Sequence, residues 1–181
     1  NAITGALTFT TQTGGSNGAD ITLNNGSTAI SLAGFTTRGN LTLETTNAIA
    51  LTANTVNGNL SVTSAGAITQ SAALTVSGTS SFTSTGTDTN ITLNTDTNAF
   101  TGSVTLTTAG TSGDVSIDNG TTALGIQGTI NGALTVRNGQ VITDSGTLTV
   151  SGASSFTIDT GSNHITLGSA ALTGAIGVST T

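Results

Sequence analysis

Apolar and polar residues alternate along most of the chain. One short pattern, an apolar residue, a hydroxyl residue and a second apolar residue, recurs from one end to the other. In a β-strand this alternation places both apolar side chains on one face and the hydroxyl on the other. No stretch has apolar residues at the i, i+3, i+4 and i+7 positions of a helix, so the pattern predicts short strands and no helix. The clearest triplets are Ile21-Thr22-Leu23, Leu41-Thr42-Leu43, Leu60-Ser61-Val62, Leu74-Thr75-Val76, Leu134-Thr135-Val136 and Leu148-Thr149-Val150.

Glycine and asparagine flank nearly every triplet and predict the corners between strands. Both residues tolerate the positive φ angles that tight turns require. We therefore expect the Asn-Gly pairs to form turns. These pairs are Asn25-Gly26, Asn57-Gly58, Asn119-Gly120, Asn131-Gly132 and Asn138-Gly139.

A long segment of the chain occurs twice. Residues 58–83, GNLSVTSAGAITQSAALTVSGTSSFT, align without gaps with residues 132–157, GALTVRNGQVITDSGTLTVSGASSFT. Residues 20–34, DITLNNGSTAISLAG, match residues 114–128, DVSIDNGTTALGIQG. Repeats of this kind are typical of solenoids. A shorter marker, apolar-Thr-Gly-small-apolar, begins at Ile3, Phe100 and Leu172, so the chain ends in the phase in which it begins.

The spacing of shorter repeats predicts the coil length. The sequence GNLTL begins at Gly39 and returns as GNLSV at Gly58. Stacked coils of about 18 to 25 residues account for this spacing and predict an all-β fold, a parallel β-helix or β-solenoid. We expect a single continuous solenoid over residues 1–181, with internal repeats at about 3–99 and 100–171 and the start of a third at 172–181.

A narrow solenoid needs few apolar residues in each coil. Inward Leu, Ile and Val should stack on their counterparts in adjacent coils, and outward Thr should line the surface. Phe82 and Phe156, both in SSFT segments, are expected to fill the interior. Asparagine side chains at the corners are expected to form amide ladders between coils.

Composition and charge exclude several functional classes. The chain has two basic and eight acidic residues and a net charge of -6, so it cannot neutralise the phosphates of a nucleic acid or bind an anionic membrane surface. It has no Cys, and therefore no disulfide or thiolate metal site. No apolar run reaches the roughly 18 to 20 residues that cross a bilayer, so no membrane insertion is expected. No charged-then-apolar leader is evident, and we interpret the sequence as a mature or excised piece.

The internal repeat also tests the titratable residues. Each of four such residues in the second copy aligns with a neutral residue in the first, as expected for charges on a solvated face. No catalytic, cofactor-binding or metal-binding residue is therefore predicted, and the chain is not expected to be an enzyme or to carry a cofactor. The aligned pairs are Asp144 with Gln70, Asp159 with Thr85, Arg137 with Thr63, and His164 with Asn90.

Asp20 and Asp114 differ from these charges because both precede an alternating triplet in the repeat. A carboxylate at a turn can accept a backbone N–H, which makes a structural role the first interpretation. Weak calcium binding is the alternative, since residues 14–20 are rich in Gly and end in Asp, and Asp88 and Asp96 flank a strand. Both the spacing and the number of oxygen ligands disfavour it.

Other chemistry has little support in the sequence. His164 is the only imidazole, and Ser154 lies in a common Ser-rich context, so a nucleophilic triad is not indicated. Among carboxylates, only Asp114 and Asp118 are close in sequence, which disfavours a polysaccharide lyase or hydrolase. Single outward Thr residues and variable coil lengths disfavour ice binding. Glycosylation sequons occur at Asn25, Asn40, Asn59, Asn90 and Asn119, as a chain rich in Asn and Thr produces by chance.

The phrases GNLSVTSAGAITQSAALTVSGTSSF, ITL, FTGSVTL and ALGIQG resemble the repeat regions of filamentous-haemagglutinin-like exoproteins over essentially the whole chain. These are very large bacterial surface proteins, often exported by two-partner secretion. The resemblance implies a right-handed parallel β-helix that acts as a rod-like stalk or as fibrous extracellular material. It implies no catalytic residue. The secretion-recognition domain that opens such exoproteins is not evident in this sequence.

These observations together predict a structural repeat of a secreted or cell-surface bacterial exoprotein. The expected partners are further copies of the chain stacked end to end, or flanking repeats of a longer chain, because the end of a coil stack templates further pairing. The alternative is an adhesin, a glycan- or surface-binding module that uses the outer Thr and Asn face. The absence of Trp and Tyr, which stack on sugars, disfavours it.

Overall fold

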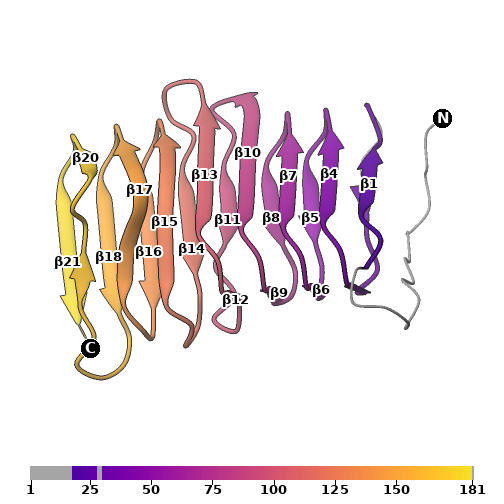
Figure 1. Ribbon diagram of the computed structural model, residues 1–181. Helices are drawn as coiled ribbons and strands as arrows, with labels where there is room; N and C mark the ends of the chain where they lie inside the picture. The colour runs from indigo at the N-terminus through magenta and orange to yellow at the C-terminus, as the bar shows by residue number, and fades with distance from the viewer. Residues whose placement is uncertain (1–17, 28–29, 181) are drawn as a thin grey trace.

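In the computed structural model, which describes residues 18–27 and 30–180, the chain forms a stack of parallel strands and no helix (Figure 1). Each strand pairs in parallel with strands of the neighbouring coils. The described strands run in order along the stack, from β1 at one end to β21 at the other. The predicted all-β parallel β-solenoid is confirmed.

The strands belong to three sheets that run the length of the stack or part of it. The first sheet contains β1 (Ile21–Asn24), β4 (Leu41–Thr45), β7 (Leu60–Ser64), β10 (Ser80–Thr87), β13 (Val104–Ala109), β15 (Leu124–Ile130), β17 (Ile142–Val150), β19 (Ile165–Thr166) and β20 (Ala170–Leu172). The second contains β2 (Ile30–Ser31), β5 (Ile49–Leu51), β8 (Ile68–Gln70), β11 (Ile91–Leu93), β14 (Val115–Asp118), β16 (Leu134–Asn138), β18 (Ser154–Ile158) and β21 (Ile176–Thr180). The third contains β3 (Thr36–Thr37), β6 (Asn54–Val56), β9 (Leu74–Val76) and β12 (Ala99–Phe100).

The cross-section of the coil changes along the stack. Up to β12 the chain visits the first, second and third sheets in turn. Beyond β12, among the described residues, the third sheet has no further strand, and the first-sheet strands β15 and β17 have 7 and 9 residues. The sequence separation of register partners in adjacent coils varies accordingly, from a short one between Leu124 and Ile142 to a long one between Ser80 and Val104. Both separations lie within the predicted range, and the predicted coil length is confirmed.

The sequence repeat does not contain a whole number of coils. Residues 60–64 form β7 in the first sheet, whereas their equivalents in the second copy, residues 134–138, form β16 in the second sheet. Between them the chain passes through the first-sheet strands β10, β13 and β15, which is three coils, and then advances by one further strand. Equivalent segments therefore lie on different faces of the rod.

The core is a continuous column of inward apolar side chains. In β4, β7 and β9 the Leu and Val residues of the alternating triplets are buried, and the residues between them are partly or fully exposed. Phe82 and Phe156 are buried as predicted, and Phe100 joins them. The rings of Phe82 and Phe100 meet edge to face with their centroids 5.8 Å apart. Each coil thus buries its apolar set against the coils above and below.

Glycine is required at the corners for two different reasons, positive φ at some positions and close approach of the backbone of the adjacent coil at others. Of the Asn-Gly pairs, Gly26 and Gly120 do adopt positive φ, whereas Gly58, Gly132 and Gly139 do not. At Gly58 and Gly132 the requirement is close approach between coils. A Cβ on Gly132 would lie 2.7 Å from the backbone carbon of Gly113, which is too close for any side chain. The Asn-Gly pairs therefore lie at corners between strands, as predicted, but only two of the five use positive φ.

Candidate functional site

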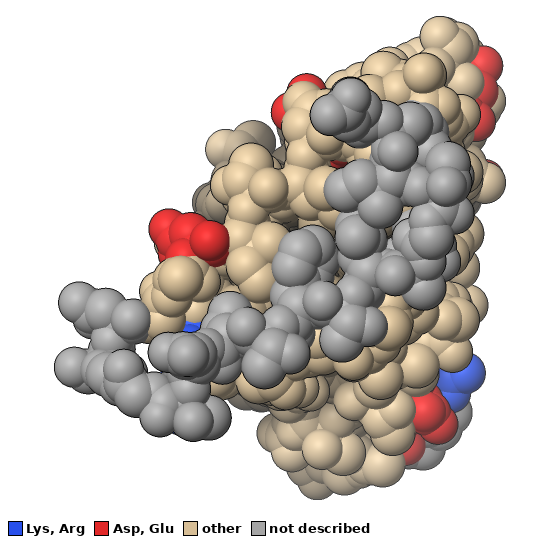
Figure 2. All heavy atoms as spheres, turned by 90° about the vertical axis from the view of Figure 1, so that its right-hand side faces the viewer, with Lys and Arg blue, Asp and Glu red and all other residues tan. Residues whose placement is uncertain are grey.

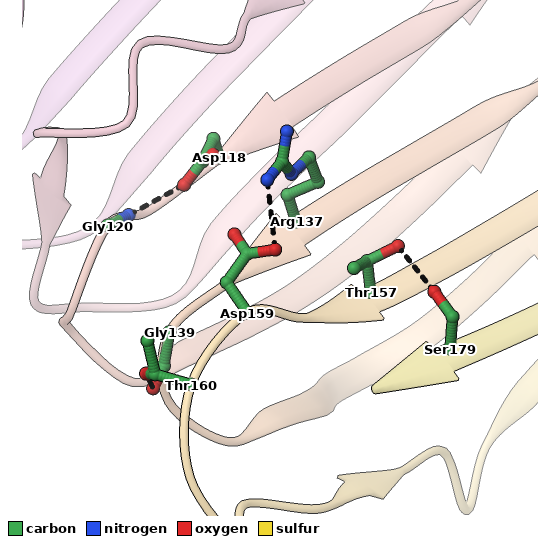
Figure 3. Close-up of polar contacts among 8 residues, drawn as sticks. All are labelled: Asp118, Gly120, Arg137, Gly139, Thr157, Asp159, Thr160 and Ser179. Carbon is green, nitrogen blue, oxygen red and sulfur yellow. Dashed lines mark hydrogen bonds and ion pairs between the residues drawn. The ribbon is translucent and has the colours of Figure 1, made fainter. Parts of the chain in front are cut away.

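A column of polar side chains runs across adjacent strands of the second sheet (Figure 3). Its members are successive register partners: Asp118 of β14, Arg137 of β16, Thr157 of β18 and Ser179 of β21. Because parallel strands stack in register, residues one coil apart in sequence become neighbours in space. The hydroxyls of Thr157 and Ser179 are 3.0 Å apart and form a hydrogen bond.

Arg137 is the cation of this column. Its Nη2 donates to Oδ1 of Asp159 at 3.0 Å, and the two side chains are 59% and 24% exposed. The hydrogen bond to Asp159 is the main cause that raises the pKa of the Arg137 guanidinium, and the negative charge of Asp159 adds to it. A pair this exposed contributes little stability, because water and salt screen it. It does hold the guanidinium in place over the sheet.

Asp118 is a nearly buried carboxylate at the end of β14, with 5% of its surface exposed. Its Oδ1 accepts the backbone N–H of Gly120 at 2.8 Å. Burial is the largest influence on the carboxyl and raises its pKa above the ordinary 3.8, since removal from water disfavours the charged form. The Gly120 hydrogen bond and the Arg137 charge act in the opposite direction, and the charge of Asp159 raises the pKa further.

A polar hollow of about 400 Å³ opens beside these side chains. It offers amide and hydroxyl groups, two carboxylates and one guanidinium within a single concave surface. Such a set of donors and acceptors can bind a ligand rich in hydroxyl groups. The lining residues are Asn94, Thr95, Asp96, Ser116, Ile117, Asp118 and Arg137.

Asp20 and Asp114, which the sequence set apart, lie at corners of the stack. Oδ1 of Asp20 accepts the backbone N–H of Asn40 at 2.8 Å, and Oδ1 of Asp114 accepts that of Ala133 at 2.7 Å. A structural role as acceptor of a backbone N–H is therefore confirmed. The donor belongs to the next coil and not to the same turn, so each carboxylate ties two coils together.

Asparagine continues the same contact at other coils, and we call the whole set the corner ladder. In each step a side-chain Oδ1 just before a strand accepts the backbone N–H at the same place in the next coil. The predicted ladder between coils is thus present, but it joins amide oxygens to backbone N–H groups and does not join amide to amide. The further steps are Asn40 to Asn59 at 2.8 Å, Asn59 to Thr79 at 2.8 Å, and Asn90 to Asp114 at 2.9 Å.

The remaining titratable candidates lie apart from one another. Asp144, interpreted from the sequence as a surface charge, accepts the backbone N–H groups of Gly168 and Ser169 and so holds the turn before β20. His164 is exposed. Asp88 accepts the N–H groups of Thr111 and Ser112 at 2.7 and 2.9 Å, and these hydrogen bonds lower the pKa of its carboxyl.

The described part of the chain contains no cluster of side chains that could bind calcium. Asp88 holds a backbone turn, whereas Asp96 lines the polar hollow. No group of three or more His, Cys, Asp or Glu that could hold a metal ion occurs among residues 18–27 and 30–180. Of the Gly-rich segment 14–20, residues 14–17 lie outside the described residues.

Two of the five glycosylation sequons are closed to modification in the folded chain. Asn25 and Asn119 are buried, and Nδ2 of Asn119 donates to the carbonyl oxygens of Phe100, Thr122 and Ala123. Asn59 and Asn90 are exposed and Asn40 is half-buried.

Sequence reasoning missed the juxtaposition of Asp118, Arg137 and Asp159, although a signal was present. Arg137 follows Asp118 at the same spacing at which the GNLSV segment follows the GNLTL segment. Residues separated by one coil length on parallel strands become neighbours. Applying the coil length to the charged residues would have brought this pair together before the fold was known.

The stacked parallel coils and the corner ladder define the chain as a β-solenoid repeat protein. A family model described as repeats of unknown function (DUF5649) matches residues 38–107 and again residues 112–179. These matches cover more than half of the chain, and the chain belongs to this family. The starts of the two matches have the same offset as residues 58 and 132, where the two copies of the long sequence repeat begin.

No curated protein and no solved structure matches the chain. A search of residues 18–27 and 30–180 finds no helix that could cross a membrane. The boundaries expected for the long repeats, at 3–99, 100–171 and 172–181, stay a prediction.

Proposed function

We propose that the chain is a structural repeat of a secreted or cell-surface bacterial exoprotein, in which stacked coils form a rigid rod. The observation that carries this proposal is the continuous backbone ladder, in which strands from β1 to β21 pair with those of adjacent coils. In such a stack each coil contacts only its neighbours, so length can grow by adding repeats without a new core. At about 4.8 Å per coil, the eight strands of the second sheet span roughly 40 Å.

The surface supports a spacer or stalk. Outward positions are mostly Thr, Ser and Asn, and the whole chain has only two basic and eight acidic residues. On the face seen in Figure 2, charged side chains stand as isolated groups among uncharged residues. A surface of this kind has few charged groups to attract partners nonspecifically. The resemblance to filamentous-haemagglutinin-like repeats supports the bacterial exoprotein setting.

Two measurements test this proposal. Small-angle X-ray scattering of the purified chain should give the profile of an elongated particle, and antibodies against the chain should label intact cells of its source. A cytosolic protein, labelled only after permeabilisation, serves as the control. Labelling of the chain only after permeabilisation would contradict the exoprotein proposal.

The second candidate function is binding of a glycan or a similar hydroxyl-rich ligand, and the polar hollow favours it. Arg137 would donate to ligand hydroxyls, with Asp96 and Asp118 as acceptors. A glycan array probed with the wild-type chain and with Arg137→Ala tests this function. Arg38→Ala is the matched control, because Arg38 is the other basic residue, is exposed and does not line the hollow. Binding that only Arg137→Ala abolishes would support the candidate, and absence of binding by the wild type would reject it.

A further inference from the structure

The Asn57-Gly58 corner differs from the other Asn-Gly corners of residues 30–180 in how its amide side chain is held. Asn57 is exposed, and its side-chain amide has no hydrogen-bond partner among the described residues. The corners with which we compare it are Asn119-Gly120, Asn131-Gly132 and Asn138-Gly139.

At the three other corners the side-chain amide is anchored to backbone carbonyl oxygens. Nδ2 of Asn131 donates to the carbonyl oxygen of Thr108 at 2.8 Å. Nδ2 of Asn138 donates to two carbonyl oxygens, each at 3.1 Å, and Nδ2 of Asn119 donates to three, at 3.1 to 3.2 Å. Asn119 and Asn138 are also buried. Rotation of these three side chains would therefore break hydrogen bonds, whereas rotation of the Asn57 side chain breaks none among the described residues.

The backbone N–H of the glycine is also held less tightly at the Asn57 corner. The N–H of Gly58 donates to the carbonyl oxygen of Gly39 at 3.3 Å. The N–H groups of Gly132, Gly139 and Gly120 donate at 3.0, 2.6 and 2.8 Å. A hydrogen bond beyond the usual distance is weaker, so the N–H of Gly58 is released more readily than the others.

These two groups, the side-chain amide and the following backbone N–H, are the reactants of asparagine deamidation. The backbone nitrogen attacks Cγ of the amide, and the amide nitrogen leaves as ammonia with the proton of the attacking nitrogen, which closes a five-membered succinimide. Water then opens the ring to aspartate or isoaspartate, so the new carboxylate contains one oxygen from the solvent. Glycine offers the least hindered nitrogen because it has no side chain. The nitrogen and Cγ must approach to about 3 to 3.5 Å, which an anchored amide prevents.

We propose that Asn57 is a modification site, at which the folded chain deamidates while the other three corners are protected. The site combines a free and exposed amide, a weakly held glycine N–H and access to water. The reaction adds one negative charge to a chain that has few charged residues. In the isoaspartate product, Cβ of residue 57 becomes part of the main chain and lengthens the corner by one atom.

The corner has no room for a longer main chain. A Cβ on Gly58 would lie 2.6 Å from the backbone carbon of Gly39, and on the other side the N–H of Gly78 donates to the carbonyl oxygen of Gly58 at 3.0 Å. The next residue, Asn59, belongs to the corner ladder, because its N–H donates to Oδ1 of Asn40 at 2.8 Å. Isoaspartate at position 57 therefore loosens this coil from both of its neighbours.

Mass spectrometry of the aged chain tests the proposal. The purified chain is incubated at pH 8 and 37 °C in water enriched in oxygen-18 and then digested with pepsin. Electron-transfer fragmentation of the peptides localises the gain in mass and distinguishes isoaspartate from aspartate. The labelled oxygen separates deamidation during the incubation from deamidation during digestion. We expect Asn57 to deamidate at least tenfold faster than each of Asn119, Asn131 and Asn138.

The matched control is the same incubation in enough urea to unfold the chain, as checked by circular dichroism. Unfolding frees all four pairs, so the advantage of Asn57 should disappear. Equal rates at the four residues in the folded chain would overturn the proposal, and so would an advantage of Asn57 that persists in urea, because local sequence would then set the rate.

A second variant tests the loosening of the corner. Asn57→Gln removes the reactive group, since the longer side chain cyclises far more slowly. After equal incubation, the wild type should unfold at a lower urea concentration than Asn57→Gln, whereas the two freshly purified chains should unfold alike. Equal urea midpoints of the two aged chains, with isoaspartate present in the wild type, would overturn the loosening.

Discussion

The Asp114 carboxylate accepts a hydrogen bond from the backbone N–H of Ala133 at 2.7 Å, and the two residues belong to adjacent coils. Asn40, Asn59 and Asn90 make the same contact with an amide oxygen. The contact therefore needs an acceptor at that place and not a negative charge.

This relationship predicts opposite results for two substitutions of Asp114. Asp114→Asn should have the same free energy of unfolding as the wild type, because the amide oxygen can accept the hydrogen bond that the carboxylate oxygen accepts. Asp114→Ala should lower it by about 1 kcal/mol, since one inter-coil hydrogen bond is lost. Urea denaturation followed by circular dichroism measures both. An equal loss in the two variants would show that the charge matters and the acceptor does not.

Gly152→Ala should destabilise the chain because adjacent coils approach so closely at this corner that a Cβ has no room. That Cβ would lie 2.5 Å from both the carbonyl carbon and the oxygen of Gly132. We expect a loss of about 2 kcal/mol in the free energy of unfolding, as for overpacking against a rigid neighbour. Gly168→Ala is the matched control, since a Cβ at Gly168 meets nothing within 4 Å and should change stability by less than about 0.5 kcal/mol.

Ser80 and Ser154, equivalent residues of the two repeats, carry buried hydroxyls without a hydrogen-bond partner among the described residues. An unpaired buried hydroxyl costs free energy, so Ser80→Ala and Ser154→Ala should each raise the free energy of unfolding by about 1 kcal/mol. Ser64→Ala is the control, because its Oγ donates to the carbonyl oxygen of Asn47, and it should lower stability. The idea fails if all three variants lose stability to the same extent.

Asp118 should make the chain less stable as pH rises above 3.8. Burial raises the pKa of this carboxyl in the folded state, so ionisation is easier in the unfolded chain. Its contribution to stability is therefore fully present below 3.8 and is lost as pH rises through the raised pKa. Asp118→Asn, which keeps an acceptor for Gly120, should be at least as stable as the wild type at pH 7. Urea midpoints at pH 4 and pH 7 give the comparison, and a lower midpoint for the variant at pH 7 would contradict it.

Asp88 should show the opposite pH dependence. The N–H groups of Thr111 and Ser112 lower the pKa of its carboxyl, so its contribution is present above 3.8 and is lost as pH falls through the lowered pKa. Asp88→Asn should therefore be less stable than the wild type at pH 7 and approach it in acid. A stability difference between the two chains that does not narrow at low pH would show that the charge of Asp88 is not involved.

Val178→Lys should prevent end-to-end association without unfolding the chain. Val178 is 64% exposed, so a lysine there can reach water in the single chain, but it would have to be buried if a second copy stacked on β21. Sedimentation velocity over a range of concentrations should show larger species for the wild type and not for Val178→Lys. Thr157→Lys, on a strand inside the stack, is the control and should associate like the wild type. Unchanged association of Val178→Lys would place the contact elsewhere.

The alternation of apolar and hydroxyl residues determined which side chains face inward. Leu60, Val62, Leu74 and Val76 are buried as the pattern predicts, because the direction of a side chain in a strand depends only on its place in the local sequence. The spacing of the GNLTL and GNLSV segments likewise determined the coil length, since a stacked coil must return to its starting point after a set stretch of chain. Fold class and core were accessible to sequence reasoning for these reasons.

Only the tertiary structure decided which face of the rod each segment joins and which polar groups meet there. The repeats at residues 60–64 and 134–138 lie in different sheets because the long sequence repeat contains three coils and one additional strand. The corners show the same ambiguity, because one sequence pattern admits both positive φ, as at Gly120, and close backbone approach, as at Gly132. The coil length made Asp118 and Arg137 candidate neighbours, but only the register of β14 on β16 placed them side by side.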